Sequence, residues 1–204
     1  MLKKKVSTLF HLALVLTLSL LLCLPLAGFA GQPEVPTLET PLAVTTCGQS
    51  PGALMIWVLS KQIKLPCDRD DLLTAEKLKA KADAGTPYKT LIITTGTSMK
   101  GMGAAGVDID FEVARVKAII AEAKKQGIFI VGAHIEGMAR RVDDTDAASI
   151  ATVTPESSLL LIREDSNEDG YFTKAAEAQN IPIITFKETL DLSPIFQELF
   201  NLEG

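Results

Sequence analysis

The sequence has few of the residues from which metal centres are built. Its 204 residues include only 3 cysteines and 2 histidines. One histidine lies in the apolar N-terminal stretch, so His134 is the only histidine in the rest of the chain. A zinc site takes three or four protein ligands, and His134 with the neighbouring Glu136 supplies too few. The sequence therefore does not predict a zinc protein.

Positive charge is also scarce. Lys+Arg number 20 against 25 Asp+Glu, a formal net charge of −5. Three of the lysines, Lys3 to Lys5, stand in the first thirty residues, which hold no acid, so the rest of the chain carries −8. An acidic surface repels the phosphates of nucleic acids and anionic lipids. We therefore expect neither nucleic acid nor a membrane surface as a partner.

The first thirty residues have the pattern of a signal peptide. The lysines at 3–5 precede an apolar run over 9–24, and Gly28-Phe29-Ala30 places small residues where a signal peptidase cuts. We expect cleavage after Ala30 and export. One alternative is lipid attachment at Cys23, which a leucine precedes where a small residue is required. Another is an uncleaved membrane anchor, although the run is short for a span and Pro25 interrupts its end.

Two cysteines, Cys47 and Cys67, follow the signal segment. An even number of cysteines in an exported protein suggests a disulfide. The residues between them, however, predict one helix over 51–64, roughly 20 Å long. A disulfide requires Cα atoms within about 7 Å of each other. We therefore predict two free thiols at opposite ends of the helix.

The remaining chain predicts one α/β domain over 42–204, preceded by an extended, proline-rich segment over 31–41. Strand cores such as Leu91-Ile92-Ile93 are continuous apolar runs, typical of strands that helices cover on both faces. The expected strands are 42–46, a weak strand at 67–73, 89–95, 128–133, 158–163 and 182–186. The expected helices are 51–64, 74–84, 108–126, 146–151, 171–179 and 194–200. This alternation predicts a doubly wound, mostly parallel sheet of the flavodoxin-like or Rossmann-like kind.

Ligands of such sheets bind outside the carboxyl ends of the strands. The first loop there contains Gly48-Gln49-Ser50-Pro51-Gly52, which fits the G-x-S-x-G elbow of serine hydrolases. In that elbow the residue after the serine donates its N–H to the oxyanion, and Pro51 has no N–H. We therefore expect Ser50 to cap the next helix. Cys47, just before the loop, is either a small buried residue or a thiol activated by the helix N-terminus.

The second loop, residues 96–106, is rich in glycine and contains G-x-G-x-x-G from Gly101 to Gly106. The acidic residue that a dinucleotide site requires about twenty positions later is missing. The loop nevertheless has backbone N–H groups, two hydroxyls and Lys100, which together suit an anion. The alternative is a loop whose glycines serve only its turns.

The third loop holds His134, Glu136, Arg140 and Arg141. Arginine forks suit carboxylates and phosphates. The alternative is a histidine bonded to a neighbouring loop, with the arginines paired to the acids of the segment 143–146.

The fourth loop, Asp165-Ser166-Asn167-Glu168-Asp169-Gly170, matches the opening of a calcium loop. Asp165, Asn167 and Asp169 would be the ligands. Position twelve is Ala176 rather than glutamate, and the entering element is a strand. The alternative is a solvated acidic turn with Asp169 as a helix cap.

Four segments, TTCGQSPGALM, GTSMKGMGAAGVDIDFEVARV, GAHIEGMARR and EDSNEDGYFTKAAEAQNIPI, carry a likeness to known sequences. Together they resemble an uncharacterised family of exported bacterial α/β proteins, defined as a domain of unknown function. The resemblance covers essentially the whole chain after the signal segment. It implies export and a flavodoxin-like or Rossmann-like architecture, and it assigns no role to any residue.

Three functions remain open, and the first is binding of a small anionic ligand. Its expected contacts are Gln49, Ser50, Ser98, Lys100, Gly101, Gly103, Arg140 and Arg141. The second is an enzyme in which Cys47 is the nucleophile and His134, held by Glu136, is the base. The third is a structural or interaction role at the cell envelope, which an exposed apolar stripe on the final helix would favour. That stripe is Ile195, Phe196, Leu199 and Phe200.

Overall fold

A computed structural model describes residues 33–202 of the chain. Six parallel strands form one sheet in the order β2-β1-β3-β4-β5-β6. The strands are β1 (Leu42–Cys47), β2 (Cys67–Arg69), β3 (Thr90–Thr95), β4 (Phe129–His134), β5 (Leu159–Arg163) and β6 (Ile183–Phe186). The expected signal peptide over 1–30 and the alternative lipid site at Cys23 lie outside the described residues.

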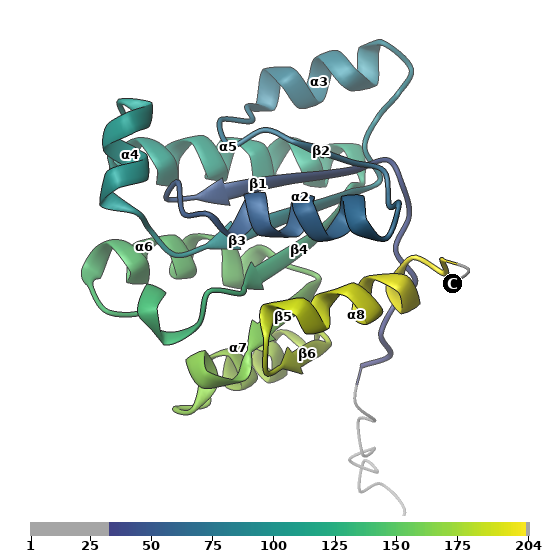
Figure 1. Cartoon of the computed structure of the whole chain (residues 1–204). Helices are drawn as coiled ribbons and strands as arrows, with labels where there is room; N and C mark the ends of the chain where they lie inside the picture. Colours follow the sequence, from purple (N-terminus) through teal and green to yellow (C-terminus); the bar gives the residue numbers. More distant parts are fainter. Residues whose placement is uncertain (1–32, 203–204) are drawn as a thin grey trace, which may run out of the picture. The chain divides into compact units, whose positions relative to one another are not determined.

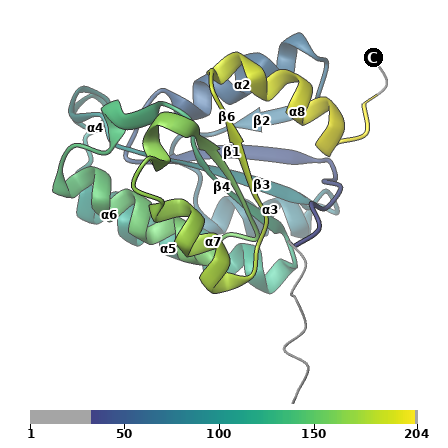
Figure 2. The ribbon, with the colours of Figure 1, turned by 90° about the horizontal axis from the view of Figure 1, so that it is seen from below.

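Helices cover both faces of the sheet, as the views in Figures 1 and 2 show. On one face α2 (Gly52–Gln62) and α8 (Leu192–Leu199) pack against each other and against the sheet. The other face carries α3 (Ala75–Asp83), α5 (Ile109–Gln126), α6 (Asp144–Val153) and α7 (Tyr171–Gln179). The prediction of a doubly wound α/β fold is confirmed.

The apolar runs of the sequence explain why these strands are central. Every residue of β1 and of β3 is buried, because both faces of these strands lie under helices. Val44 and Ile92 face α2 and α8, whereas Ala43 and Leu91 face α3 and α5. Alternate residues of one strand thus enter two separate cores.

The structure differs from the prediction in two helices. The glycine-rich loop contains a helix, α4 (Met99–Ala105), which Ser98 caps at its start and Gly106 ends in the left-handed conformation. Helix α2 begins at Gly52 rather than at residue 51 and ends at Gln62, and although it is apolar nearly all round it buries one side only. Its outer side leaves Leu54, Met55 and Val58 exposed.

Cys47 and Cys67 are both buried free thiols, as the helix between them predicted. The stripe on the final helix belongs to the core, since Phe196, Leu199 and Phe200 are buried there. Within residues 33–202, no helix combines the length and apolar character needed to cross a membrane.

Candidate functional site

The sheet has a topological switch point between β1 and β3. The chain passes from β1 outward to β2 and then returns to β3 on the other side of β1. The loops after β1 and β3 meet there, and a bridge joins Gln49 to Thr97. Ligands of doubly wound proteins bind at this position, so a ligand site is expected here.

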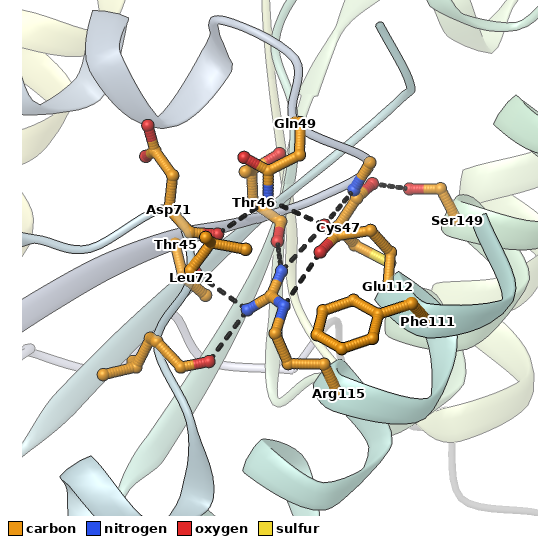
Figure 3. A network of polar contacts seen from close by, with 12 residues as sticks. Thr45, Thr46, Cys47, Gln49, Asp71, Leu72, Phe111, Glu112, Arg115 and Ser149 are labelled. Carbon is orange, nitrogen blue, oxygen red and sulfur yellow. Dashed lines mark hydrogen bonds and ion pairs between the residues drawn. The ribbon is translucent and has the colours of Figure 1, made fainter. Parts of the chain in front are cut away.

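A buried ion pair fills the switch point in this protein (Figure 3). Glu112 is 0% exposed and Arg115 is 7% exposed, and both come from the first two turns of α5. Arg115 Nε lies 2.9 Å from Glu112 Oε1, and Arg115 Nη2 lies 2.8 Å from Glu112 Oε2. The guanidinium also donates to the carbonyl oxygens of Thr46 and Leu73 and to the hydroxyl of Thr45. Every N–H of the guanidinium therefore has an acceptor.

Glu112 occupies the place that a ligand anion would take. Its Oε2 accepts from the backbone N–H of Gly48 at 2.8 Å and from the side-chain amide of Gln49 at 3.1 Å. Glu112 and Arg115 are charged residues of an amphipathic helix, yet both are buried. The loops after β1 and β2 cover the N-terminal turns of α5, so a helical pattern alone does not show their burial.

Two further carboxylates fill the neighbouring donor positions. Glu136 Oε1 accepts from the N–H of Gly52 at 3.0 Å, at the start of α2. Asp146 Oδ1 accepts from both the N–H and the hydroxyl of Thr97, each at 2.7 Å. The chain's own acids thus satisfy the donors at which an external anion was expected.

Ser50 is not the helix cap that the sequence predicted. Helix α2 begins after Pro51 without a side-chain cap from its own sequence, and Glu136 supplies the acceptor instead. Ser50 is buried, and its hydroxyl has no hydrogen-bond partner among the described residues.

The second loop is built for close packing. A Cβ on Gly101 would lie 2.1 Å from the carbonyl oxygen of Gln49, so only glycine allows α4 to approach the β1–α2 loop. Ser98 caps α4 by accepting from the N–H of Gly101 at 3.1 Å. Gly103 has open space around it, and Lys100 is exposed on the same short helix. Lys100 is therefore exposed to solvent and is not part of the buried polar network.

Both arginines of the third loop have partners other than the acids expected for them. Arg140 pairs with Glu136 at 3.1 Å and donates to the carbonyl oxygen of Thr97 at 2.7 Å. Arg141 makes two parallel bonds to Asp169, at 3.0 and 2.9 Å. This arginine fork holds the pKa of Asp169 at about 2. The alternative pairing with Asp143, Asp144 or Asp146 is not found: Asp143 caps α6, and Asp146 accepts from the N–H groups of Thr97 and Val142.

Cys47 and His134 do not form the pair that the enzyme hypothesis requires. Thr95 lies opposite Cys47 on β3, and its Oγ1 is 2.9 Å from His134 Nδ1 on β4. Cys47 and His134 are thus two strand spacings apart, about 10 Å. Nε2 of His134 donates to the carbonyl oxygen of Gly137 at 3.1 Å, so Nδ1 accepts from Thr95. Both ring nitrogens are therefore engaged.

The environments of the two groups also oppose catalysis. Burial raises the pKa of the Cys47 thiol to about 11, so it is not a thiolate at neutral pH. Burial lowers the pKa of His134 to about 4 and keeps the ring neutral. Glu136, the expected partner of His134, instead contacts Gly52 and Arg140.

The fourth loop uses its oxygen atoms within the protein. Asp165 pairs with Arg163, and Asn167 Oδ1 accepts from the N–H of Phe172 at 2.9 Å. Asp169 binds Arg141 and accepts from the N–H of Tyr171 at 3.1 Å. Within residues 33–202, no group of three or more histidine, cysteine or acidic side chains is arranged to hold a metal ion.

Exposed apolar side chains collect around the same loops. We define the carboxyl edge as the six segments that follow the strands and reach the first turn of the next helix: 48–55, 70–76, 96–112, 135–147, 164–174 and 187–195. These segments hold fewer than half of the described residues. Yet they carry eight of the ten exposed large hydrophobic side chains, each 37–71% exposed. The eight are Leu54, Met55, Met99, Phe111, Met138, Val142, Tyr171 and Leu190.

Charge is divided between the two ends of the sheet. The carboxyl edge contains sixteen acidic and five basic residues. The other described residues contain eight acidic and twelve basic residues. The acidity of the chain is therefore concentrated on the edge that also exposes most of the large apolar side chains.

One groove opens at this edge, between α6 and α7. It has a volume of about 240 Å³ and is lined by Arg141, Asp143, Ala147, Ile150, Ala151 and Tyr171. The guanidinium carbon of Arg141 lies 5.2 Å from the ring centre of Tyr171 and 5.4 Å from that of Phe172. We call this cavity the α6–α7 groove.

The fold and the motifs around these loops are those of a family that is so far defined by its sequence. The chain matches the family described as "Domain of unknown function (DUF6305)" over residues 39–200. The protein therefore belongs to that family, as the resemblance in its four motifs suggested. No curated protein matches the chain in sequence.

Several solved structures are similar in fold. A CheY-like protein from Pseudomonas aeruginosa is 14% identical, with 81% of this chain and 98% of that chain covered and a TM-score of 0.34. A GDSL-like lipase from Bacteroides thetaiotaomicron is 12% identical, with coverages of 76% and 71% and a TM-score of 0.35. A psychrotrophic esterase from Pseudoalteromonas is 9% identical, with coverages of 78% and 94% and a TM-score of 0.30. At these values no activity passes from those proteins to this chain.

Proposed function

We propose that this protein is an extracytoplasmic binding module whose carboxyl edge docks a cationic polypeptide that also carries apolar side chains. The observation that carries the proposal is the coincidence of two surfaces on one edge. Most of the exposed large apolar side chains lie there, and so do fourteen of the 22 described acidic residues that are not buried, the buried Glu112 and Asp146 being left out. Exposed apolar side chains that gather on one side of a domain are typical of a contact surface.

The polar interior of the edge supports binding rather than catalysis. Glu112, Glu136 and Asp146 satisfy the backbone donors at the switch point, and Cys47 and His134 are buried and apart. An enzyme requires groups that can reach a substrate, whereas a docking surface requires a stable platform. The Glu112–Arg115 pair bonds to β1 and to the loops after β1 and β2, and so supplies that platform.

Charge selects the sign of the partner. A partner with lysine and arginine side chains gains favourable electrostatic energy from the acidic edge, and a nucleic acid or an acidic protein is repelled. The acids steer the partner, while affinity comes from burying apolar side chains such as Met99 and Leu190. The partner therefore needs both kinds of residue.

The test uses three ten-residue peptides and isothermal titration calorimetry. The first alternates lysine and leucine, the second replaces the lysines with glutamate, and the third replaces the leucines with alanine. We expect the lysine–leucine peptide to bind at least tenfold more tightly than the other two, and more weakly at 300 mM than at 50 mM salt. Equal or tighter binding of the glutamate peptide would refute the proposal.

A charge-reversed pair of variants locates the binding surface. Asp144→Lys with Glu168→Lys changes two exposed acids of the carboxyl edge. Asp83→Lys with Glu177→Lys makes the same change in net charge on two exposed acids outside that edge. The edge variant should bind the lysine–leucine peptide at least fivefold more weakly, and the matched control should bind as the parent protein does. Equal weakening by both pairs would mean that net charge alone attracts the peptide.

A small carboxylate at Arg141 is the second candidate function, and the bidentate contact with Asp169 favours it. In this second candidate, the carboxylate of Asp169 occupies the position at Arg141 that a ligand carboxylate would take. Replacing it in Asp169→Ala would free the guanidinium, and succinate should then raise the melting temperature more than sodium chloride of equal ionic strength. The double variant Asp169→Ala/Arg141→Ala should lose this response. A single variant that responds no better than the double variant would rule the candidate out.

Export is the part of the proposal that depends on the leader. The lysines, apolar run and Gly28-Phe29-Ala30 of the sequence support it. N-terminal sequencing of the protein recovered from an expressing bacterium should begin at Gly31. An intact N-terminus on a cytoplasmic protein would contradict this.

A further inference from the structure

We infer that the α6–α7 groove is the anchor pocket of the carboxyl edge and that it takes one apolar side chain, flanked by basic residues, from the partner. This inference rests on the proposed function, because it names the part of the edge that recognises a side chain of the partner. It adds a specific site and a specific type of side chain.

The size of the groove suits a single side chain. Its volume of about 240 Å³ lies below the range of about 300–1,000 Å³ that drug-sized ligands occupy. An aromatic or branched aliphatic side chain is of the right order for such a space. Protein interfaces commonly concentrate their binding energy in a few side chains of this kind, each seated in a pocket.

The lining is apolar where an anchor would rest. Ile150 is 4% exposed and lies at the base of the groove, and Ala147 and Ala151 present small side chains from the exposed side of α6. The ring of Tyr171 forms the opposite wall, 38% exposed and stacked edge-on against Phe172. The α6 side of the groove is therefore apolar, and the ring of Tyr171 adds an apolar face, which favours an apolar occupant.

The surroundings favour basic neighbours of that anchor. Asp143 lines the groove, Asp144 follows it on α6, and Asp169 lies beside Tyr171; all three are exposed. Arg141 is the one cation of the lining, and Asp169 already neutralises it through two hydrogen bonds. A lysine or arginine next to the anchor thus meets unpaired negative charge at the rim.

The test is a titration of the 15N-labelled protein with two pentapeptides, followed by NMR. One has a phenylalanine between two pairs of lysines, and the other has alanine in the central position. We expect the phenylalanine peptide to bind at least fivefold more tightly and to shift the amide signals of Ala147, Ala151 and Tyr171 most. Shifts confined to other parts of the edge, or equal affinity of the two peptides, would overturn the inference.

Matched variants separate the pocket from the general surface. Ala147→Phe places a ring in the groove, whereas Ala118→Phe makes the same change at an exposed position of α5 outside it. Ala147→Phe should abolish the preference for phenylalanine and leave the weak binding of the alanine peptide unchanged. Ala118→Phe should retain the preference. A preference that survives Ala147→Phe refutes the anchor pocket even when the lysine–leucine peptide still binds to the edge; if no cationic peptide binds at all, both proposals fail.

Discussion

The switch point and the α6–α7 groove lie on the same edge of the sheet, yet they treat polar groups in opposite ways. At the switch point Glu112 and Arg115 are almost completely buried, and their hydrogen-bonding groups have partners within the chain. At the groove Tyr171 and Asp143 face solvent, and a cavity remains between two helices.

The difference shows that a fold can keep its topology while the position of its open surface moves. The strand order places a ligand position between β1 and β3. In this protein the Glu112–Arg115 pair of α5 fills that position and holds the loops after β1 and β2 together. The open surface lies two strands further along the sheet, beyond β4. Topology alone therefore does not locate the surface available to a partner.

The largest expected effect comes from opening the switch point. Glu112→Ala leaves Arg115 as a buried, unpaired cation and should lower the free energy of unfolding by about 3–5 kcal/mol. Urea denaturation measures the change. The double variant Glu112→Ala/Arg115→Met should lose less than Glu112→Ala alone, because no uncompensated charge remains. A double variant that is less stable than the single one would contradict this account.

The contact between α4 and the β1–α2 loop should give the next largest effect. Gly101→Ala brings a Cβ to within 2.1 Å of the carbonyl oxygen of Gln49 and should cost about 3 kcal/mol, at the upper end for overpacking. Gly103→Ala is the matched control on the same helix. It meets open space and should raise stability by up to about 1 kcal/mol, as alanine does in helices. Similar effects of the two changes would show that α4 does not pack closely against the β1–α2 loop at Gly101.

His134 lies between the two regions and should make stability depend on pH. Burial lowers the pKa of His134 to about 4 from 6.5, so the unfolded chain binds a proton between these values while the folded chain does not. The contribution of His134 to the free energy of unfolding is therefore fully present above about pH 6.5 and is lost as the pH drops towards 4. From pH 7 to pH 5 the loss should be about 2 kcal/mol from this residue.

Chemical denaturation at the two pH values, with His134→Gln as the reference, isolates that contribution. The variant should lose about 2 kcal/mol less than the parent protein over the same interval. An equal loss in both proteins would mean that His134 titrates normally and is open to solvent.

The smallest effect is expected at Lys100, which the sequence placed in the ligand site. Its side chain is exposed on α4, so Lys100→Ala should change the free energy of unfolding by less than about 0.5 kcal/mol. It should also leave binding of the lysine–leucine peptide unchanged or slightly stronger. Calorimetry under the conditions of the charge-reversal experiment provides the comparison. A marked loss of affinity would show that Lys100 contributes to peptide binding.

The sequence predicted the elements well, because their signals are local. The continuous apolar runs identified all six strands to within one or two residues, apart from a weak strand that proved to be only Cys67–Arg69. Helix α4 was missed because its glycines have low helix propensity. Its terminal signals, Ser98 as the cap and Gly106 as the stop, were nevertheless present in the sequence.

The candidate site was predicted less well, because it depends on which loops cover which helices. Charged residues of an amphipathic helix normally face solvent, whereas the loops after β1 and β2 bury Glu112 and Arg115. Helix α2 is apolar on its outer side too, and Leu54 and Val58 are exposed there because the helix packs against the sheet and α8 with its other side. The burial of these side chains depends on how loops and helices are arranged in three dimensions. The spacing of residues along a single helix does not predict it.

The internal carboxylate of Glu112 has a consequence for how the edge responds to its surroundings. A site that waits for an outside ligand gains stability only as the free concentration of that ligand exceeds its dissociation constant. A group attached to the same chain is present at a fixed effective concentration, whatever the medium contains. The switch point, which Glu112 fills, thus has no empty form to be populated by dilution. The shape of the switch point should therefore stay the same at low and at high concentrations of small anions in the medium.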